Sequence, residues 1–234
     1  MASASVDGPL VIAIDSSTTS TKAIIVDVEG NVISLGRREI ALLSPEQGFG
    51  EHDPRQWWTS TREAVGEAVG KLTPAEKERI KAFGITHQRE SFAPFTADGT
   101  PLRNGILWLD IRAADQVQRY GTPEIHALSG RPADVTPGLY KMAWLKENEP
   151  ESLAKADKVT TVSAYIAFCL TGQWVDSAAC ADSLSLSNIK TLDYDDGLLQ
   201  IAGVRREQMA DLVKPGQTLG ALKPELAKEW GIAE

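Results

Sequence analysis

The stretch DSSTTSTK, residues 15–22, lies between two apolar runs near the start of the chain. The runs on either side, Leu10–Ile14 and Lys22–Val28, are short and rich in branched side chains, so the pattern predicts a strand, a tight loop and a second strand. Glu29–Asn31 has turn chemistry, and Val32–Leu42 alternates as a third antiparallel strand does. We therefore expect three sequential strands to open the domain.

Helical and strand-like patterns then follow one another along the chain. Asp53-Pro54 is a good helix start, and apolar residues recur after it at helical spacing. Further strands are expected over Ile80–Thr86, Ser91–Phe95 and Gly105–Leu109, and further helices over Ala113–Tyr120, Leu139–Glu147 and Val162–Leu170. No repeat or linker is visible, so we expect one mixed α/β domain with an embedded helical, loop-rich subregion.

Composition narrows the class of protein. With 234 residues, 42% of them hydrophobic and 24% charged, the chain is typical of a soluble protein with a sizeable core. The formal net charge of -8 argues against a nucleic-acid partner, and no run approaches the roughly 20 apolar residues of a membrane span. Cys169 and Cys180 form no CxxC pair, which predicts reduced thiols in a cytoplasmic protein. Residues 1–9 are expected to be a disordered tail, not a signal peptide.

The Ser/Thr-rich loop contains the groups that hold a phosphate. Its backbone N–H groups and hydroxyls can face an anion, and Asp15 at a strand end can hold Mg²⁺ through water. This would be phosphate binding without a Walker sequence. A solvated hairpin is the structural alternative, and it is the more common origin of such a turn.

A second polar cluster, Gln88-Arg89-Glu90, follows a predicted strand. Fixed donors and acceptors at a strand end suit the vicinal hydroxyls of a polyol. The alternative is a surface ion pair between Arg89 and Glu90. His87 alone is better explained as structural than as catalytic.

A third cluster surrounds Trp108. If the strand predicted there continues, Trp108, Asp110 and Arg112 lie on one side, where the indole would cover the apolar face of a sugar and the charges would take its hydroxyls. The alternative is a core tryptophan beside a structural Asp110–Arg112 bridge.

Taken in order, these clusters resemble the FGGY family of carbohydrate kinases, which belong to the actin/hexokinase/Hsp70-like ATPases. The family opens with Asp-x-Gly-Thr-Thr-Ser-x-Lys/Arg, continues with Gln-Arg-Glu after a strand, as in glycerol kinases, and then has Ile-x-Trp-x-Asp-x-Arg. Residues 15–22, 88–90 and 106–112 correspond to these motifs. The resemblance covers nearly the whole chain. It implies a ribonuclease-H-like α/β fold, a mixed sheet flanked by helices, with residues 10–234 forming the N-terminal kinase domain.

The resemblance also implies roles for individual residues. Asp15 would help to hold Mg²⁺. The phosphate of ATP would lie near Ser17, Thr18, Thr19, Ser20 and Lys22, and the sugar near Gln88, Arg89, Glu90, Trp108 and Asp110. Ser17 departs from the family, which usually has glycine there. Its side chain would either crowd the approach of backbone to phosphate or add a hydroxyl donor.

What the resemblance places outside this sequence is equally specific. Family members are much longer and have the base that deprotonates the substrate in a Gly-Asp segment at the start of their second half, followed by the adenosine pocket. We expect that segment beyond Glu234, so no catalytic residue is assigned in this chain. Half of a cleft is expected to be nearly inert.

The sequence therefore favours the substrate-binding half of an ATP-dependent sugar kinase, with ATP and Mg²⁺ as cofactors. A pentulose such as xylulose is placed slightly ahead of glycerol, because the chain as a whole looks closer to xylulokinases although its Gln-Arg-Glu is typical of glycerol kinases. A homodimer is one expected state of the full-length enzyme. The alternative from a different class is a noncatalytic module that senses a sugar or binds a partner protein.

Overall fold

The computed structural model describes residues 8–233, so most of the predicted N-terminal tail lies outside the described residues. Its first sheet has four strands in the order β3-β2-β1-β5. Their bounds are β1 Leu10–Ser16, β2 Ser20–Asp27, β3 Val32–Glu39 and β5 Ile80–His87. β1 runs antiparallel to β2 and parallel to β5, which makes the sheet mixed.

The register of this sheet brings two distant segments together. Ser16, the last residue of β1, pairs with His87, the last residue of β5. Because the two strands are parallel, the Ser/Thr-rich loop after β1 and the Gln-Arg-Glu segment after β5 leave the sheet at the same edge.

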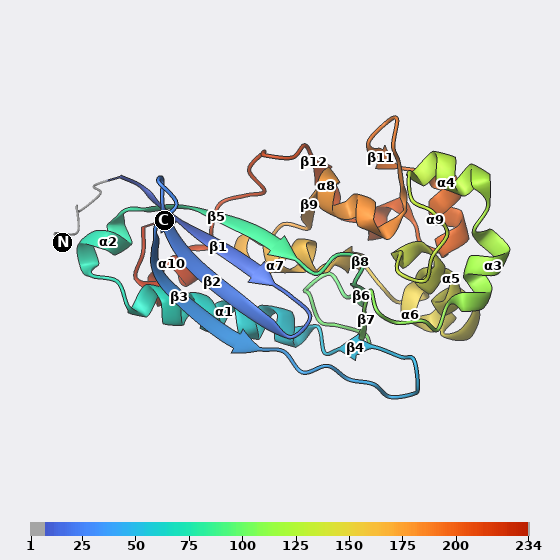
Figure 1. The fold of residues 1–234 in the computed structure, drawn as a ribbon, viewed down its shortest axis with the longest axis horizontal. Helices are drawn as coiled ribbons and strands as arrows, with labels where there is room; N and C mark the ends of the chain where they lie inside the picture. Colours follow the sequence, from blue (N-terminus) through green and yellow to red (C-terminus); the bar gives the residue numbers. More distant parts are fainter. Residues whose placement is uncertain (1–7, 234) are drawn as a thin grey trace.

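Helix α1, Arg55–Gly70, covers one face of the sheet (Figure 1). The sheet residues beneath it alternate, with Leu10, Ile12 and Ile14 fully buried. At Gly36 of β3 an added Cβ would lie 2.0 Å from the carbonyl oxygen of Ala64, so only glycine permits the close approach of α1. Helices α7, Val162–Thr171, and α10, Pro224–Trp230, complete the same core.

A second sheet lies near the middle of the molecule, between the first sheet and a second core at the other end (Figure 1). The sheet has the order β4-β7-β6-β8, with β4 Glu51–His52, β6 Phe92–Phe95, β7 Gly105–Ile106 and β8 Lys158–Thr161. The helices of this part are α3 Ala114–Tyr120, α4 Pro123–Ser129, α5 Gly138–Asn148, α6 Pro150–Ala154 and α9 Asp196–Ala202. The remaining elements are α2 Pro74–Glu78, β9 Val175–Ser177, α8 Ala178–Ala181, η1 Asp182–Leu184, β10 Ser187–Asn188, β11 Asp193–Tyr194, η2 Arg206–Gln208 and β12 Asp211–Val213.

The three opening strands and the long first helix are confirmed, with different bounds. β1 continues to Ser16 and β2 begins at Ser20, so the loop between them is shorter than the predicted stretch 15–22. The third strand ends at Glu39, not at Leu42, and the strand predicted over Gly105–Leu109 ends at Ile106. The early end of β7 matters for the site, because Trp108 and the residues after it lie in a turn. Between residues 8 and 233, none of the helices combines the length and apolar character that crossing a membrane requires.

Candidate functional site

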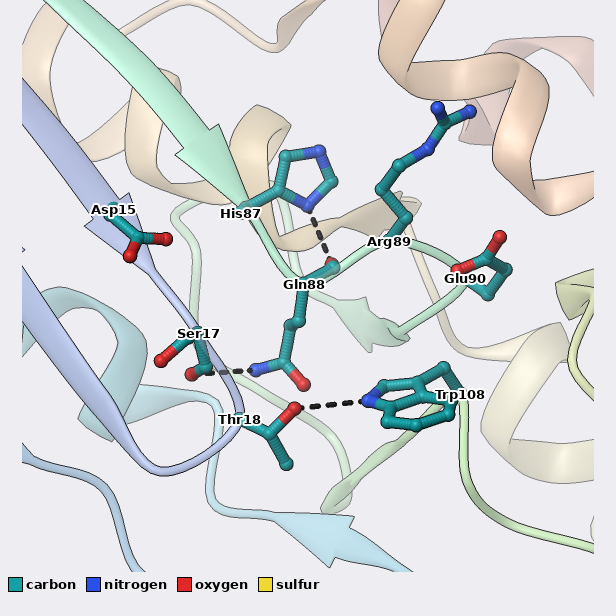
Figure 2. A pocket seen from close by; sticks show the side chains of 8 residues that line it. All are labelled: Asp15, Ser17, Thr18, His87, Gln88, Arg89, Glu90 and Trp108. Atoms are coloured by element: carbon teal, nitrogen blue, oxygen red, sulfur yellow. Dashed lines mark hydrogen bonds between the residues drawn. The ribbon is translucent and has the colours of Figure 1, made fainter.

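The loops after β1 and β5 and the turn after β7 surround one pocket of about 270 Å³ (Figure 2). Its lining consists of Asp15, Ser17, Thr18, His87, Gln88, Arg89, Glu90 and Trp108. The structure thus brings together residues from all three clusters that the sequence analysis selected. Four of the predicted site residues, Thr19, Ser20, Lys22 and Asp110, are not part of the lining.

The Ser/Thr-rich loop is closed by its own hydrogen bonds. The backbone N–H of Ser17 donates to the carbonyl of Ser20 at 3.0 Å, and the Ser17 hydroxyl donates to the same oxygen at 2.7 Å. Ser17 has no positive φ, so the conformational freedom of glycine is not needed at this position. Since its hydroxyl proton is used inside the loop, Ser17 tightens the turn.

Asp15 and Lys22 face each other across the β1–β2 pair. The Lys22 ammonium lies 3.5 Å from the Asp15 carboxylate, and both side chains are a little over one third exposed. Lys22 therefore does not line the pocket itself and contacts it only by its ion pair with Asp15. Thr19 is exposed at the tip of the loop, and Ser20 is buried, so neither side chain lines the pocket.

Gln88 is a buried bridge under the loop. Its amide nitrogen lies 3.5 Å from the Ser17 carbonyl and 3.3 Å from Nδ1 of His52, and its amide oxygen accepts from the Ser91 hydroxyl at 3.2 Å. These partners use much of its hydrogen-bonding capacity. Gln88 therefore supports the Ser/Thr-rich loop and shows only part of its side chain to the pocket.

Sequence analysis did not select His52, which is fully buried at the end of β4. The Trp57 indole N–H donates to its Nδ1 at 3.0 Å, so the ring proton lies on Nε2. Burial lowers the pKa of His52 to about 4. A neutral histidine therefore lies beneath Thr18 and Gln88. Its place in the sequence, next to Asp53-Pro54, did not indicate this role.

Arg89 and Glu90 are each already paired with a distant residue. Arg89 contacts Asp182 on the surface, and Glu90 contacts Arg131 at 2.5 Å. Within residues 8–233, Glu90 is one of three non-glycine residues with positive φ, at 63°. Such a backbone costs free energy and persists where surrounding contacts hold it, here including a bond from the Glu90 N–H to Ser183 at 3.2 Å. The strained backbone directs Glu90 into the pocket.

Trp108 lies in the turn that follows β7 and is 41% exposed. Its indole N–H donates to the Thr18 hydroxyl at 2.9 Å, a bond visible in Figure 2. Its backbone N–H donates to the Ser91 hydroxyl at 3.1 Å, and its carbonyl accepts from the Lys141 ammonium at 3.0 Å. The backbone of Trp108 is therefore fixed from both sides while its ring faces the pocket.

Asp110 is not a pocket residue, which corrects the prediction that it contacts the substrate. Its side chain is fully buried, and its two oxygens accept from the backbone N–H groups of Gly50 and Arg112 and from the Arg112 guanidinium at 2.7 to 2.9 Å. The predicted common side of Trp108 and Asp110 fails because the turn replaces the strand. The structural alternative, an Asp110–Arg112 bridge, is what the structure shows.

Lys141, to which the sequence analysis assigned no role, is fully buried beneath this turn. Its ammonium donates to the carbonyls of Leu107, Trp108 and Thr136 at 2.7, 3.0 and 2.8 Å. Burial lowers its pKa to about 7. All three donors are satisfied, so Lys141 ties the Trp108 turn to the start of α5.

His87 separates the two sides of the pocket at the end of β5. Its Nδ1 lies 2.7 Å from the carbonyl of Gln88 and must donate to it. Burial lowers the pKa of His87 to about 4, so the ring is neutral near pH 7.

Comparison with known proteins defines the class. Residues 10–234 match the N-terminal domain of the FGGY family of carbohydrate kinases, and the chain belongs to this family. The glycerol kinase of Thermococcus gammatolerans is 35% identical over 92% of this chain and 45% of its own length. The xylulose kinase of Escherichia coli is 29% identical over 96% of this chain and 46% of its own length.

Solved structures agree on the fold. A ligand-bound xylulose kinase from Lactobacillus acidophilus superposes with a TM-score of 0.89 at 28% identity, covering 96% of this chain and 46% of that one. Glycerol kinase from Plasmodium falciparum, solved with ADP, has a TM-score of 0.86 at 25% identity, covering 95% and 46%. The expected ribonuclease-H-like fold is confirmed. The chain spans about half the length of the relatives it matches.

Proposed function

We propose that this chain is the substrate-binding half of an ATP-dependent carbohydrate kinase, whose parent transfers the γ-phosphoryl group of ATP to a hydroxyl of a small sugar or polyol. One observation carries the proposal: the Ser/Thr-rich loop and the Glu90–Trp108 side line the same pocket. A phosphate and a hydroxyl held on these two sides would be neighbours, and phosphoryl transfer depends on such positioning.

The phosphate side fits Mg²⁺ and the end of a nucleotide. Asp15 presents a partly exposed carboxylate oxygen, the ligand type that Mg²⁺ prefers. No group of three or more acidic, histidine or cysteine side chains forms a cage in the described part of the chain, so Asp15 would share the ion with water and phosphate oxygens. Bound there, Mg²⁺ would neutralise phosphate charge. Thr18 would contribute its backbone N–H group, because the Ser17 N–H is already bonded to the Ser20 carbonyl, and Lys22 would add a nearby positive charge.

The substrate side fits a small molecule with several hydroxyls. A volume of about 270 Å³ suits a short carbon chain better than an oligosaccharide. The Trp108 ring would cover its C–H surface, while Arg89 would donate to its hydroxyls and Glu90 would accept from them. Because both charged residues are already paired, the substrate would share or replace Asp182 and Arg131 as their partners.

The substrate proposed first remains a pentulose such as xylulose. Glycerol is the second candidate, and two observations favour it: the Gln88-Arg89-Glu90 sequence at the pocket, and the higher identity of the glycerol kinase of T. gammatolerans. The base and adenosine pocket are proposed to belong to the remainder of the parent. A cytoplasmic location and a homodimer stay predictions.

The test is turnover of a substrate panel by the full-length parent and by this chain alone. We expect ATP-dependent phosphorylation of D-xylulose, D-ribulose, L-ribulose or glycerol by the parent, and no measurable turnover by the isolated chain. A parent that binds a sugar without phosphorylating it would support the noncatalytic module instead. Robust turnover by the isolated chain would contradict the division of the site between two halves.

A further inference from the structure

One hydrogen bond joins the two sides of the pocket directly. The Trp108 indole N–H donates to the Thr18 hydroxyl at 2.9 Å, linking residues 90 positions apart (Figure 2). Thr18 belongs to the proposed phosphate loop, and Trp108 to the proposed sugar subsite. The bond therefore lies between the two reactants of the proposed reaction.

We propose that the Thr18–Trp108 hydrogen bond couples the sugar subsite to the phosphate loop, so that sugar and nucleotide strengthen each other's binding. Thr18 acts in this proposal as a positioning residue. The proposal rests on the proposed kinase function and adds to it a route by which occupancy of one subsite is sensed at the other.

The chemistry of a hydroxyl makes Thr18 suited to this role. Its oxygen accepts the indole N–H and still has its own proton to donate. A phosphate oxygen on the loop side could receive that proton. Each of the two bonds would then polarise the other, as in other hydrogen-bond chains.

In the Trp108 turn the backbone is held by hydrogen bonds, so that only the indole ring can move when a ligand binds. Ser91 and Lys141 fix the N–H and carbonyl of Trp108, at 3.1 and 3.0 Å, while the side chain is 41% exposed. A sugar packed against the ring would limit its motion and hold the indole N–H toward Thr18. Conversely, a phosphate that orders Thr18 would hold the ring ready for the sugar.

A second path supports the same connection from below. Ser91, which accepts from the Trp108 backbone, donates to Gln88 at 3.2 Å, and the Gln88 amide reaches the carbonyl of Ser17 at 3.5 Å. Trp108 is thus connected to neighbouring residues of the phosphate loop through both its side chain and its backbone. Removing the Thr18 bond should weaken the coupling without releasing the turn.

The experiment measures the sugar Kd of the full-length parent by calorimetry, with and without a nonhydrolysable ATP analogue. The probe is the panel compound that the wild type binds most tightly, and the coupling factor is the ratio of the two Kd values. Thermodynamic linkage makes this factor the same for both ligands. A purely structural defect would change both Kd values equally and leave the ratio unchanged.

We expect Thr18→Val and Trp108→Phe each to reduce the coupling factor by about 2- to 12-fold, the range expected for one neutral hydrogen bond. Thr18→Ser keeps the oxygen and should retain the wild-type factor. The double variant should be no worse than either single variant, because both remove the same bond. Thr59→Val, on the exposed face of α1, is the matched control and should leave the factor unchanged.

The proposal is overturned by a wild-type coupling factor near 1, by an unchanged factor in Thr18→Val, or by effects of the two single variants that multiply in the double variant. These results differ from failure of the proposed function. A parent that couples the two ligands but transfers no phosphate contradicts only the kinase assignment. A parent that binds no compound of the panel contradicts both.

Discussion

The two sides of the pocket are built in different ways. On the phosphate side, Asp15 faces Lys22 across adjacent strands and Ser17 bonds to Ser20, so these positions are set by neighbouring residues. On the substrate side, the partners of Arg89 and Glu90 lie 93 and 41 positions away. The phosphate side takes most of its shape from one hairpin, to which Gln88 and Trp108 add contacts from other segments, whereas the charged residues of the substrate side have distant partners only.

The largest expected effect tests the local side. In the full-length parent, Asp15→Ala should lower kcat by about 100-fold or more while changing the sugar KM little, because the lost charge acts mainly on the transition state. The free energy of unfolding of the chain should change by less than about 1 kcal/mol, since the Lys22–Asp15 pair is exposed. Steady-state kinetics and urea unfolding measure the two quantities. A large loss of stability would show that this side is not set locally.

The pH dependence of stability tests the burial of His87, which lies at the end of β5. The pKa of His87 lies at about 4 in the folded chain, below its ordinary value of 6.5, because of burial. The unfolded chain therefore binds more protons between these values, and stability falls as the pH falls from 6.5 to 4. A shift of this size corresponds to about 3 kcal/mol.

His87→Asn removes the titrating ring and keeps an amide donor for the Gln88 carbonyl. The difference in free energy of unfolding between wild type and this variant should shrink by roughly 3 kcal/mol between pH 7 and pH 4. Urea unfolding at several pH values measures it, and His52 titrates in both proteins. A difference that stays constant with pH would mean that His87 is not buried as described.

Two substitutions of Glu90 distinguish its role in sugar binding from the strain of its backbone. Glu90→Ala should lower kcat/KM for the sugar by about 5- to 150-fold, because an unpaired hydrogen-bonding group costs roughly 1–3 kcal/mol. The nucleotide KM should scarcely change. Comparing substrates across the panel measures the effect, and an unchanged kcat/KM for every compound would remove Glu90 from the sugar site.

Glu90→Gly is the matched variant for strain. It should lose the same activity, yet it should be more stable than Glu90→Ala by about 1 kcal/mol, because glycine tolerates the positive φ at this position. Thermal unfolding of the two variants distinguishes these effects. Equal stability would argue that the left-handed backbone at Glu90 is not strained.

The smallest expected effect concerns the surface pair on the same side. Asp182→Asn should cost less than about 1 kcal/mol of stability, since both side chains are about half exposed and screened by water. The proposed replacement of Asp182 by a sugar hydroxyl as the partner of Arg89 requires such a low cost. A larger cost, measured by urea unfolding, would mean that Arg89 is held as firmly as Glu90.

The sequence predicted the parts of the molecule that depend on local pattern. The β1–loop–β2 hairpin follows from alternation and turn chemistry, and α1 follows from its apolar spacing. The position of Trp108 could not be read in this way, because a turn and a strand share the same apolar residues over 105–109. Asp110 was misassigned for a related reason: its partner Gly50 lies 60 positions away.

The burial of Lys141 could not be predicted from the sequence, since nothing in the neighbouring residues shows that three carbonyls surround its ammonium. That enclosure has a practical consequence. A reagent that acylates primary amines can reach Lys141 only after the Trp108 turn has separated from α5. The rate at which the Lys141 amine is labelled therefore reports how often the turn opens. Peptide mass mapping over time would measure this labelling rate, and a molecule bound against the Trp108 ring would lower it.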